Sequence, residues 1–328
     1  MTAHSEPLDS VLATVGETPL VRVHAAPDAV PVYAKVESFN PGASVKDRIG
    51  RYMLEAMLDR GDLAPGGTVV EPTAGNTGIG MAIAAGQLDL EAVFVVPEKF
   101  SVEKQRLMAA LGAEIVTTPT DDGIPGAIDR AYDIAAEREN AVVPEQFSNP
   151  LNVEAHYETT APEVFDALDG AVGAVVAGVG TAGTLMGLAR YAREQDPAIH
   201  VVAVEPEGSE FATLLGGDSD DRDYLIEGIG THDPERNELF DPDLVDEVRQ
   251  VSDRAAHAEL KRLATEEGHL VGSSAGAASV AARRVAEAID GGEIDAPADS
   301  VATVFPDSSE RYLSKDIYGS FEDWSEHT

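Results

Sequence analysis

Short apolar runs alternate with longer helical patterns along most of this sequence, and this alternation limits the possible folds more than any other feature. The runs are rich in β-branched residues, and the patterns that follow them carry apolar side chains at helical spacing over about ten to fifteen residues. Clear pairs are TVVEP (68–72) with NTGIGMAIAAGQ (76–87) and AVVAGVG (174–180) with TLMGLARYAREQ (184–195). Strands that alternate with helices form parallel sheets with both faces covered. We therefore predict an α/β fold with twisted, mostly parallel sheets flanked by helices.

The alternation pauses twice, and the chain of 328 residues is long enough for two domains. The first pause is the polar, proline-containing stretch PEQFSNPLN (144–152). We interpret it as a crossing between two α/β domains. The second pause is the long acidic and glycine-rich segment 216–243. It is longer than a typical loop, so we predict that it is functional or mobile.

Acidic residues outnumber basic ones along the whole chain, with 59 Asp and Glu against 23 Lys and Arg and a formal net charge of −36. Such a charge repels nucleic acids and anionic membranes, so neither is an expected partner. We interpret the surplus as a halophilic, salt-adapted surface, because molar salt shortens the Debye length to about 3 Å and screens the repulsion. An ordinary acidic protein is the alternative.

The composition also narrows the chemistry and the location. The sequence contains no cysteine, which excludes disulfides, thiolate ligands and cysteine nucleophiles. Its eight histidines show no metal-like spacing, so no metal site is predicted. The first ten residues lack the basic and apolar regions of a signal peptide, and no apolar run approaches the roughly 20 residues of a membrane span. We expect a cytoplasmic protein.

The stretch VVAGVGTAGTLMG (175–187) contains a glycine turn in which Gly178, Gly180 and Gly183 have the spacing of a dinucleotide-binding motif. A strand that passes through such a turn into a helix directs backbone N–H groups and the positive end of the helix dipole at one point, which suits an anion. Glu205 ends the next strand-like run and could hold a ribose hydroxyl. An NAD-dependent oxidoreductase is therefore one hypothesis.

Two observations favour a compact monophosphate instead of a dinucleotide at this turn. A dinucleotide-binding unit usually opens its domain, whereas this turn lies past the middle of the chain. Thr181 and Thr184 also add two hydroxyls to the backbone donors. A glycine turn that binds nothing remains the alternative for this segment alone.

Lys46 follows a Pro-Gly turn at the front of a helical pattern, with Ser44 as the expected N-cap. The positive end of a helix and burial both favour the neutral amine, so we expect the pKa of Lys46 to fall. Lysines with a lowered pKa form Schiff bases with aldehydes. A solvent-facing lysine is the alternative.

A second strand-to-helix turn, EPTAGNTG (71–78), is rich in hydroxyl, amide and glycine. Thr73, Asn76 and Thr77, with the N–H groups of Ala74 and Gly75, suit a carboxylate. Two anion-binding turns and a lysine suited to imine formation indicate a cofactor that carries both an aldehyde and a phosphate. That cofactor is pyridoxal 5′-phosphate.

At this point the sequence resembles a known family, that of cysteine synthase and cystathionine β-synthase, which are fold type II pyridoxal phosphate enzymes. The resemblance extends from residue 16 to about residue 318 and rests on these blocks in the family's order: NPGASVKDR, EPTAGNTG, QFSNP, GVGTAGT, EGIG, GSSAGAA and FPDSSERYLS. Matching blocks in register are far more specific than one glycine motif. The dinucleotide spacing is accordingly interpreted as a coincidence of shared phosphate chemistry.

The resemblance implies a role for each matching residue. Lys46 would carry the cofactor as an internal aldimine and then remove the substrate α-proton, and Asn76 would bind the 3′-oxygen of the ring. The cofactor-binding residues would be Lys46, Asn76, Gly180, Thr181, Ala182, Gly183, Thr184 and Ser274. The substrate carboxylate would be surrounded by Thr73, Ala74, Thr77 and Gln146.

By the same resemblance, Ser274 would face the ring nitrogen. A neutral hydroxyl makes the ring a weaker electron sink than an aspartate would, which favours elimination over transamination. The expected intermediate is an aminoacrylate that a sulfur nucleophile attacks, with ping-pong kinetics. The alternative is that Ser273 or Ser274 merely caps the following helix.

Two positions depart from the commonest family pattern. Ala74 stands where many relatives have serine, which leaves the choice of leaving group open. Ala182 replaces a glycine of the glycine turn, and we expect it to be tolerated if its φ is negative.

The resemblance also implies domains and an assembly. Residues 1–37 and 151–328 would form a larger domain that binds the cofactor phosphate, and residues 38–150 a smaller, mobile domain with the substrate loop. A homodimer is expected.

The predicted function is that of a cysteine synthase, which converts O-acetylserine and sulfide to cysteine and acetate. EPEGS (205–209) and the block from 305 to 318 look more like the cystathionine-forming branch, so homocysteine with serine or O-acetylserine is the alternative. A third hypothesis, suggested by Ala74, is a non-catalytic relative that binds an amino acid or a partner.

Overall fold

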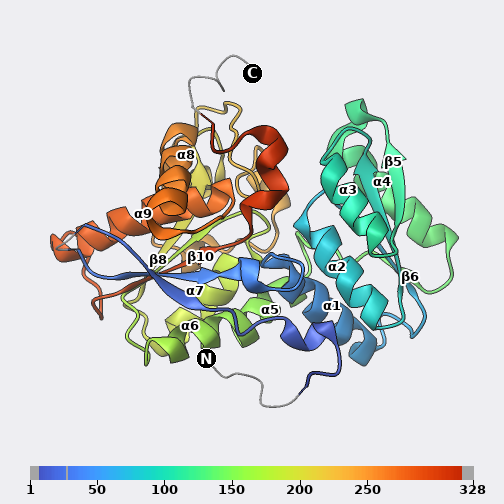
Figure 1. The fold of residues 1–328 in the computed structure, drawn as a ribbon, viewed down its shortest axis with the longest axis horizontal. Helices are drawn as coiled ribbons and strands as arrows, with labels where there is room; N and C mark the ends of the chain where they lie inside the picture. The colour runs from blue at the N-terminus through green and yellow to red at the C-terminus, as the bar shows by residue number, and fades with distance from the viewer. Residues whose placement is uncertain (1–6, 27–28, 320–328) are drawn as a thin grey trace. The chain divides into compact units, whose positions relative to one another are not determined.

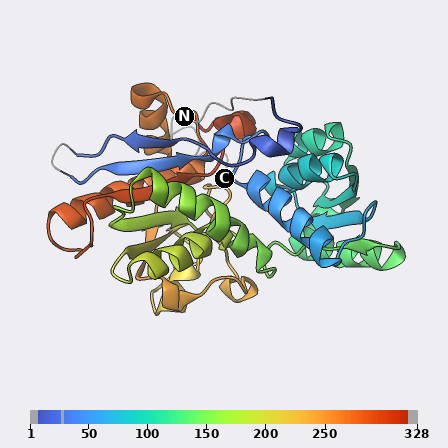
Figure 2. The same ribbon diagram turned by 90° about the horizontal axis from the view of Figure 1, so that it is seen from below.

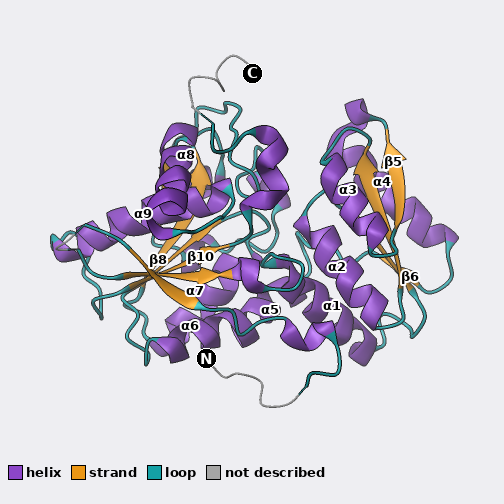
Figure 3. Cartoon of the chain, viewed as in Figure 1, coloured by secondary structure: helices purple, strands orange, loops and turns teal. Residues whose placement is uncertain are grey.

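The computed structural model describes residues 7–26 and 29–319, and its strands gather in two separate sheets (Figure 1, Figure 3). The chain divides into two units. The first comprises Met1–Glu17 and Phe39–Ala155, and the second comprises Thr18–Ser38 and His156–Thr328. Each unit has its own sheet and its own helices, so the predicted α/β class is confirmed.

The first unit contains a four-stranded sheet in the order β5-β4-β3-β6, in which all strands are parallel. Its strands are β3 (Thr68–Pro72), β4 (Glu91–Pro97), β5 (Glu114–Thr118) and β6 (Ala141–Val142). Its helices are α1 (Lys46–Arg60), α2 (Asn76–Gln87), α3 (Val102–Ala110), α4 (Gly123–Glu137) and α5 (Leu151–Ala155).

Successive residues along each strand of this sheet point to opposite faces, so their side chains pack in two different apolar clusters. Val69 and Phe94 pack in one apolar cluster with residues of α1 and α2. Val70 and Val93 pack in another with residues of α4. Both faces are therefore covered, which explains why the strands are continuous apolar runs.

The second unit contains a six-stranded sheet in the order β1-β2-β10-β7-β8-β9. Its strands are β1 (Leu20–Val23), β2 (Val32–Val36), β7 (Ala174–Gly178), β8 (His200–Pro206), β9 (Glu247–Val251) and β10 (Val301–Phe305). Among the described strands of this sheet, the edge strand β1 alone runs antiparallel to its neighbour. Figure 2 shows the blue strands β1 and β2 beside the red β10, which joins the beginning of this unit to its end.

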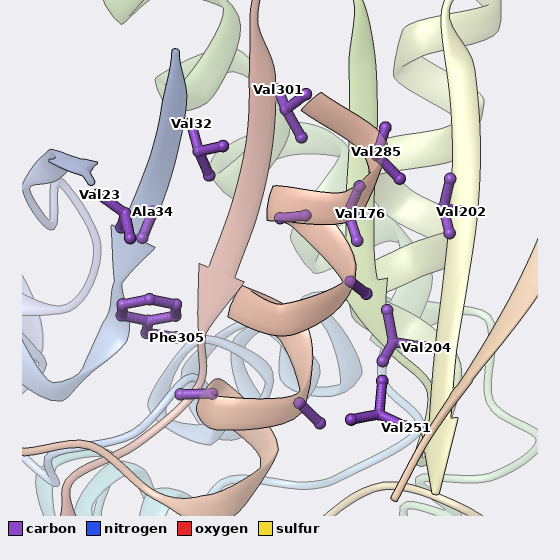
Figure 4. Close-up of a cluster of buried hydrophobic side chains, with 14 of the residues drawn as sticks. Val23, Val32, Ala34, Val176, Val202, Val204, Val251, Val285, Val301 and Phe305 are labelled. Atoms are coloured by element: carbon purple, nitrogen blue, oxygen red, sulfur yellow. The ribbon is translucent and has the colours of Figure 1, made fainter. Parts of the chain in front are cut away.

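The main helices of the second unit are α6 (Ala161–Ala167), α7 (Gly183–Gln195), α8 (Asp253–Arg262) and α9 (Ser273–Asp290). The alanine-rich α9 packs closely on the sheet, and Figure 4 shows Val285 of this helix near Val176 and Val202 of the strands.

Short 3₁₀ and π-helical segments complete the described part of the two units. Two are π-helical, η4 (His156–Thr160) and η8 (Leu263–Glu267). The 3₁₀ turns are η1 (Val11–Thr14), η2 (Glu37–Phe39), η3 (Thr120–Asp122), η5 (Phe211–Leu215), η6 (Pro234–Arg236), η7 (Pro242–Leu244) and η9 (Ser309–Lys315).

The unit boundaries differ from the expected domain boundaries at the start of the chain. We expected residues 1–37 to belong together, but residues up to Glu17 belong to the first unit. The reason is packing, because Leu12 is buried in the cluster that contains Ile49 and Met53. Arg51 also donates a hydrogen bond to the Leu12 carbonyl at 3.0 Å.

The predicted crossing at 144–152 lies just before the last unit boundary, which falls after Ala155. Within residues 7–26 and 29–319, no helix is both long and apolar enough to span a bilayer.

Candidate active site

Lys46 is the first residue of α1 and is half-buried. The expected cap at Ser44 is wrong by one position, because Val45 occupies the N-cap and already has helical backbone angles. Ser44 nevertheless contributes, since its hydroxyl accepts the N–H of Lys46 at 3.3 Å. The local sequence therefore fixes the start of the helix at the predicted lysine.

The backbone of Lys46 is held by a close approach of α1 to α2. A Cβ atom added at Gly80 of α2 would overlap the carbonyl oxygen of Lys46, and one added at Gly50 of α1 would overlap the backbone of Gly80. Only glycine allows two helix backbones to approach this closely. The two glycines thus fix Lys46 relative to α2.

The residues that join β3 to the first turn of α2, here called loop 73–77, are stabilised by hydroxyl groups. The Gly75 N–H donates to Thr73 Oγ1 at 3.2 Å, and Thr77 Oγ1 donates to Gln146 Oε1 at 2.6 Å. Thr73, Thr77 and Gln146 are buried, whereas Ala74 and Asn76 are half-buried. The structure therefore places Thr77 and Gln146, far apart in sequence, in direct contact.

Loop 73–77 ends at the first turn of α2, whose initial N–H groups have no partner within the helix. Such groups and the positive end of the helix dipole suit a carboxylate. The predicted substrate residues in this loop thus adjoin a set of backbone donors.

The glycine turn, residues 178–184, connects β7 to α7. Thr181 and Gly183 are buried, and Thr184 at the start of α7 is half-buried. The Thr184 hydroxyl lies 3.2 Å from His156 Nε2, whose other ring nitrogen lies 2.8 Å from Thr160 Oγ1. Sequence reasoning did not find His156, which is fully buried.

The condition under which Ala182 was expected to be tolerated, a negative φ, is not met. Its φ is +67°, in the left-handed region where a Cβ is unfavourable and glycine is preferred. The turn from strand to helix requires this backbone conformation, so the alanine is retained with some strain.

The glycines of this turn are explained by a second segment that packs against it. A Cβ at Gly178 would lie 2.6 Å from the Ile229 side chain, and one at Gly180 would overlap the Gly228 carbonyl oxygen. The Gly230 N–H donates to the Val179 carbonyl at 2.7 Å. Residues 228–230 of the acidic segment therefore form the support behind the glycine turn.

Ser274 and Ser273 have different roles at the start of α9. The N-cap is Gly272, without a side-chain cap, so the capping alternative is wrong for both serines. Ser273 Oγ accepts the Glu227 N–H at 3.0 Å. The Ser274 residue is buried, and its hydroxyl has no hydrogen-bond partner among the described residues.

Comparison with known proteins identifies the chain. A family model described as pyridoxal-phosphate dependent enzyme matches residues 11–307. This chain belongs to the pyridoxal-phosphate dependent enzymes.

Named relatives cover almost the whole chain. The O-acetylserine dependent cystathionine beta-synthase of Bacillus subtilis is 43% identical over 318 residues, which cover 95% of this chain and 98% of the relative. A cysteine synthase of Helicobacter pylori is 43% identical over 309 residues, 93% of this chain and 96% of that one. The crystal structure of O-acetylserine dependent cystathionine beta-synthase from Helicobacter pylori has a TM-score of 0.84 at 41% identity, with coverage of 96% and 100%.

Pyridoxal phosphate, predicted from the sequence, is the cofactor of this family. Two features of the second unit fit it. The glycine turn leads into the N-terminus of α7, a helix of 13 residues whose first N–H groups can bind an anion. Ser274 is a buried residue at the start of α9, and its neutral hydroxyl is of the kind that could bind a ring nitrogen.

Glu205 does not fit the dinucleotide interpretation. The residue is fully buried, and its carboxylate accepts the N–H groups of Phe211 and Ala212 at 2.8 and 3.1 Å. Gln250 Nε2 donates to it at 3.0 Å. This carboxylate stabilises the start of η5, so it is not available to a ribose hydroxyl.

Proposed function

We propose that this pyridoxal phosphate enzyme is a cysteine synthase, which replaces the acetate group of O-acetylserine with sulfide and releases cysteine. Relatives named cysteine synthase and O-acetylserine dependent cystathionine beta-synthase, both 43% identical and aligned over more than nine tenths of the chain, support β-replacement. The observation that carries the proposal is the contact between Thr77 and Gln146 at the N-terminus of α2, which places two polar side chains next to the first backbone N–H groups of that helix, the donors that suit an amino-acid carboxylate.

When bound, the cofactor supplies an aldehyde and a ring that withdraws electrons from the substrate Cα. Lys46 Nζ would hold the aldehyde carbon and then accept the α-proton of the substrate. Asn76 would orient the ring by a hydrogen bond to its 3′-oxygen. Ser274 Oγ would contact the ring nitrogen without a full charge, which keeps electron withdrawal moderate.

Residues of the glycine turn would bind the phosphate. The N–H groups of Gly180, Thr181, Ala182, Gly183 and Thr184 would be the main donors, and the two threonine hydroxyls would add to them. His156 Nε2 would orient the Thr184 hydroxyl, which lies 3.2 Å away.

Thr73, Thr77 and Gln146 would bind the substrate carboxylate together with the first N–H groups of α2. Ala74 lies in the same loop and offers only its N–H, so it leaves space beside the reacting group. This arrangement would hold Cα of the substrate in a fixed orientation while Lys46 accepts its proton.

Cystathionine formation is the second candidate, because two of the compared proteins carry the name O-acetylserine dependent cystathionine beta-synthase. Product analysis with purified holoenzyme distinguishes the two. We expect O-acetylserine with sulfide to give cysteine, and turnover with homocysteine but not with sulfide would reverse the assignment. A nicotinamide-dependent turnover without a borohydride-reducible chromophore would contradict both.

We also propose a cytoplasmic homodimer with a salt-adapted surface. The net charge of −36 supports salt adaptation, since screening at molar salt reduces self-repulsion. Light scattering during size-exclusion chromatography tests the dimer. Unfolding measured at 0.1 M and at molar potassium chloride tests the surface, and equal stability at both concentrations would refute the adaptation.

A further inference from the structure

A buried carboxylate lies directly behind the residues that we assign to the substrate. Glu71 belongs to β3 and is only 1% exposed. Its Oε2 accepts the N–H of Glu145 at 3.2 Å, and its Oε1 accepts the N–H of Gln146 at 3.4 Å. The side chain of one segment therefore holds the backbone of another that lies far along the chain.

The N–H groups of Glu145 and Gln146 need side-chain acceptors because the sheet ends before them. Strand β6 pairs with β3 only at Ala141 and Val142, and the chain then leaves the sheet. The N–H groups that follow lose the partners that a continued strand pairing would give, and a buried N–H without a partner is costly. Glu71 provides the acceptors that β3 can no longer provide through its backbone.

Glu71 has no counter-ion among the described residues, although burying a carboxylate without a cation is unfavourable. Burial raises the pKa of Glu71 to about 7, even though the N–H groups of Gln146 and Glu145 lower it. An uncharged apolar residue here would avoid this cost but would leave both N–H groups without an acceptor.

The loop that Glu71 holds, residues 144–149, would not keep its shape unaided. Glu145 has a φ of +62°, an unfavourable value for a residue with a Cβ. Such conformations persist only where surrounding contacts impose them. The bonds from Glu71 and the hydrogen bond from Tyr132 to the Glu145 carboxylate are contacts of this kind.

Gln146 is thereby fixed at three points. Its N–H donates to Glu71, its carbonyl accepts from Asn152 Nδ2 at 2.7 Å, and its side-chain Oε1 accepts from Thr77 Oγ1 at 2.6 Å. The Gln146 side chain also forms a hydrogen bond that lowers the pKa of Glu71, so this side chain contacts both Thr77 and Glu71. A shift of the Gln146 backbone would break this arrangement.

We propose that Glu71 is a positioning residue for the amino-acid substrate, which fixes Gln146 against Thr77 so that both present one preformed arrangement to the substrate carboxylate. The inference rests on the proposed function only in taking Thr77 and Gln146 as carboxylate-binding residues. Loss of Glu71 weakens substrate binding through Gln146 and leaves the proton transfer at Lys46 largely intact.

A double-mutant cycle on the holoenzyme tests this proposal. The probe is L-alanine, an amino acid without a leaving group at Cβ, and its dissociation constant is measured by calorimetry for the wild type, Glu71→Ala, Gln146→Ala and the double variant. We expect each single variant to bind about tenfold more weakly, a typical effect of losing a hydrogen-bonded partner. The double variant should bind no more than about twofold more weakly than Gln146→Ala, because residues that act through one contact are not additive.

Kinetics with O-acetylserine separate positioning from a general structural role. In Glu71→Ala we expect KM to rise about tenfold while kcat changes less than about threefold. Glu71→Gln keeps an acceptor oxygen for the backbone and should restore most of the binding. Glu91→Ala is the matched control, since Glu91 lies on the neighbouring strand β4 and its side chain accepts only from Thr68, so the dissociation constant should not change.

Two results would overturn the proposal: binding of L-alanine by Glu71→Ala within twofold of the wild type, or independent, additive effects of Glu71 and Gln146. If Glu71→Ala does not fold, the cycle is run with Glu71→Leu, which fills the space but gives the two N–H groups no acceptor, and additivity there is equally decisive. A wild type that binds L-alanine but forms neither cysteine nor cystathionine would refute the proposed function and leave this inference open to the same binding test.

Discussion

The glycine turn and loop 73–77 begin alike, since each connects a parallel strand to a helix N-terminus, yet they are held in place differently. Backbone packing mainly holds the glycine turn, with Gly180 against the Gly228 carbonyl and the Gly230 N–H on Val179, and one side chain, Asn237, donates to the Gly180 carbonyl at 2.6 Å. Side chains hold loop 73–77, above all the hydroxyl of Thr77 on Gln146. Backbone contacts suit an anion that stays bound, whereas side-chain contacts suit a ligand that arrives and leaves in each turnover.

The largest effect is expected at Lys46, which belongs to the same unit as loop 73–77. Lys46→Ala removes both the amine that holds the cofactor and the base, so turnover of O-acetylserine with sulfide should fall by at least about 1,000-fold. Absorbance spectra before and after borohydride check the cofactor bond, which should disappear. Lys99→Ala, an exposed lysine of the same unit, is the control and should keep full activity.

A glycine-to-alanine substitution made once in each segment tests whether the two segments are held differently. Gly180→Ala places a methyl group on the Gly228 carbonyl, so the support behind the turn must move. We expect the dissociation constant of pyridoxal phosphate to rise by about 100-fold, because overpacking of this kind typically costs 1–3 kcal/mol. Fluorescence titration of the apoenzyme measures it.

Gly75→Ala is the counterpart in loop 73–77. A Cβ there would have Thr73 Oγ1 as its nearest neighbour at 3.9 Å, and the φ of −114° is ordinary for alanine. Cofactor affinity should stay within about threefold of the wild type. An equal loss of cofactor affinity in Gly180→Ala and Gly75→Ala would show that the two segments are not held differently.

The side-chain support of loop 73–77 should also make the stability depend on pH. Burial raises the pKa of Glu71 from 4.5 to about 7, so its contribution to stability is complete below pH 4.5 and is lost as the pH rises through 7. The loss amounts to about 3 kcal/mol. Relative to the wild type, Glu71→Gln should therefore become more stable by that amount between pH 4.5 and 8.

Urea unfolding at constant salt measures this difference. A constant difference for Glu71→Gln would mean that Glu71 does not titrate there, and the pH dependence would have to come from other carboxylates.

Local patterns predicted the fold well wherever neighbours in sequence are also neighbours in space. Strand β3 and helix α2 have the bounds that the apolar run and the helical spacing indicated, and Lys46 begins its helix as predicted. Contacts over long distances in sequence were not accessible in this way. Neither Glu71, which holds residues 145 and 146, nor His156, which contacts Thr184, carries a local signal.

The start of the chain shows the same limit, because only the packing of Leu12 on α1 places it in the first unit. Backbone angles could not be predicted either, since the sequence of the glycine turn does not determine the sign of φ at Ala182. Thus the sequence indicated which residues form the candidate site, and the structure was needed to show which contacts position them.

The smallest effect concerns that alanine. At φ +67° an alanine costs about 1–2 kcal/mol, which Ala182→Gly would relieve. The variant also loses a buried methyl group, about 0.8 kcal/mol, and adds about 0.4–1 kcal/mol of chain entropy in the unfolded state. The terms nearly cancel, so the free energy of unfolding should change by less than about 0.5 kcal/mol.

Ala177→Gly supplies the reference for this cancellation, because Ala177 in β7 is just as buried but has no left-handed strain. It loses the same methyl group and gains the same unfolded-state entropy without any relief, so it should cost about 1.5 kcal/mol. Urea unfolding of both variants decides the matter. If both variants lose the same free energy of unfolding, the backbone contacts behind the glycine turn already relieve the strain at Ala182. The turn would then be more adaptable than the packing of its glycines indicates.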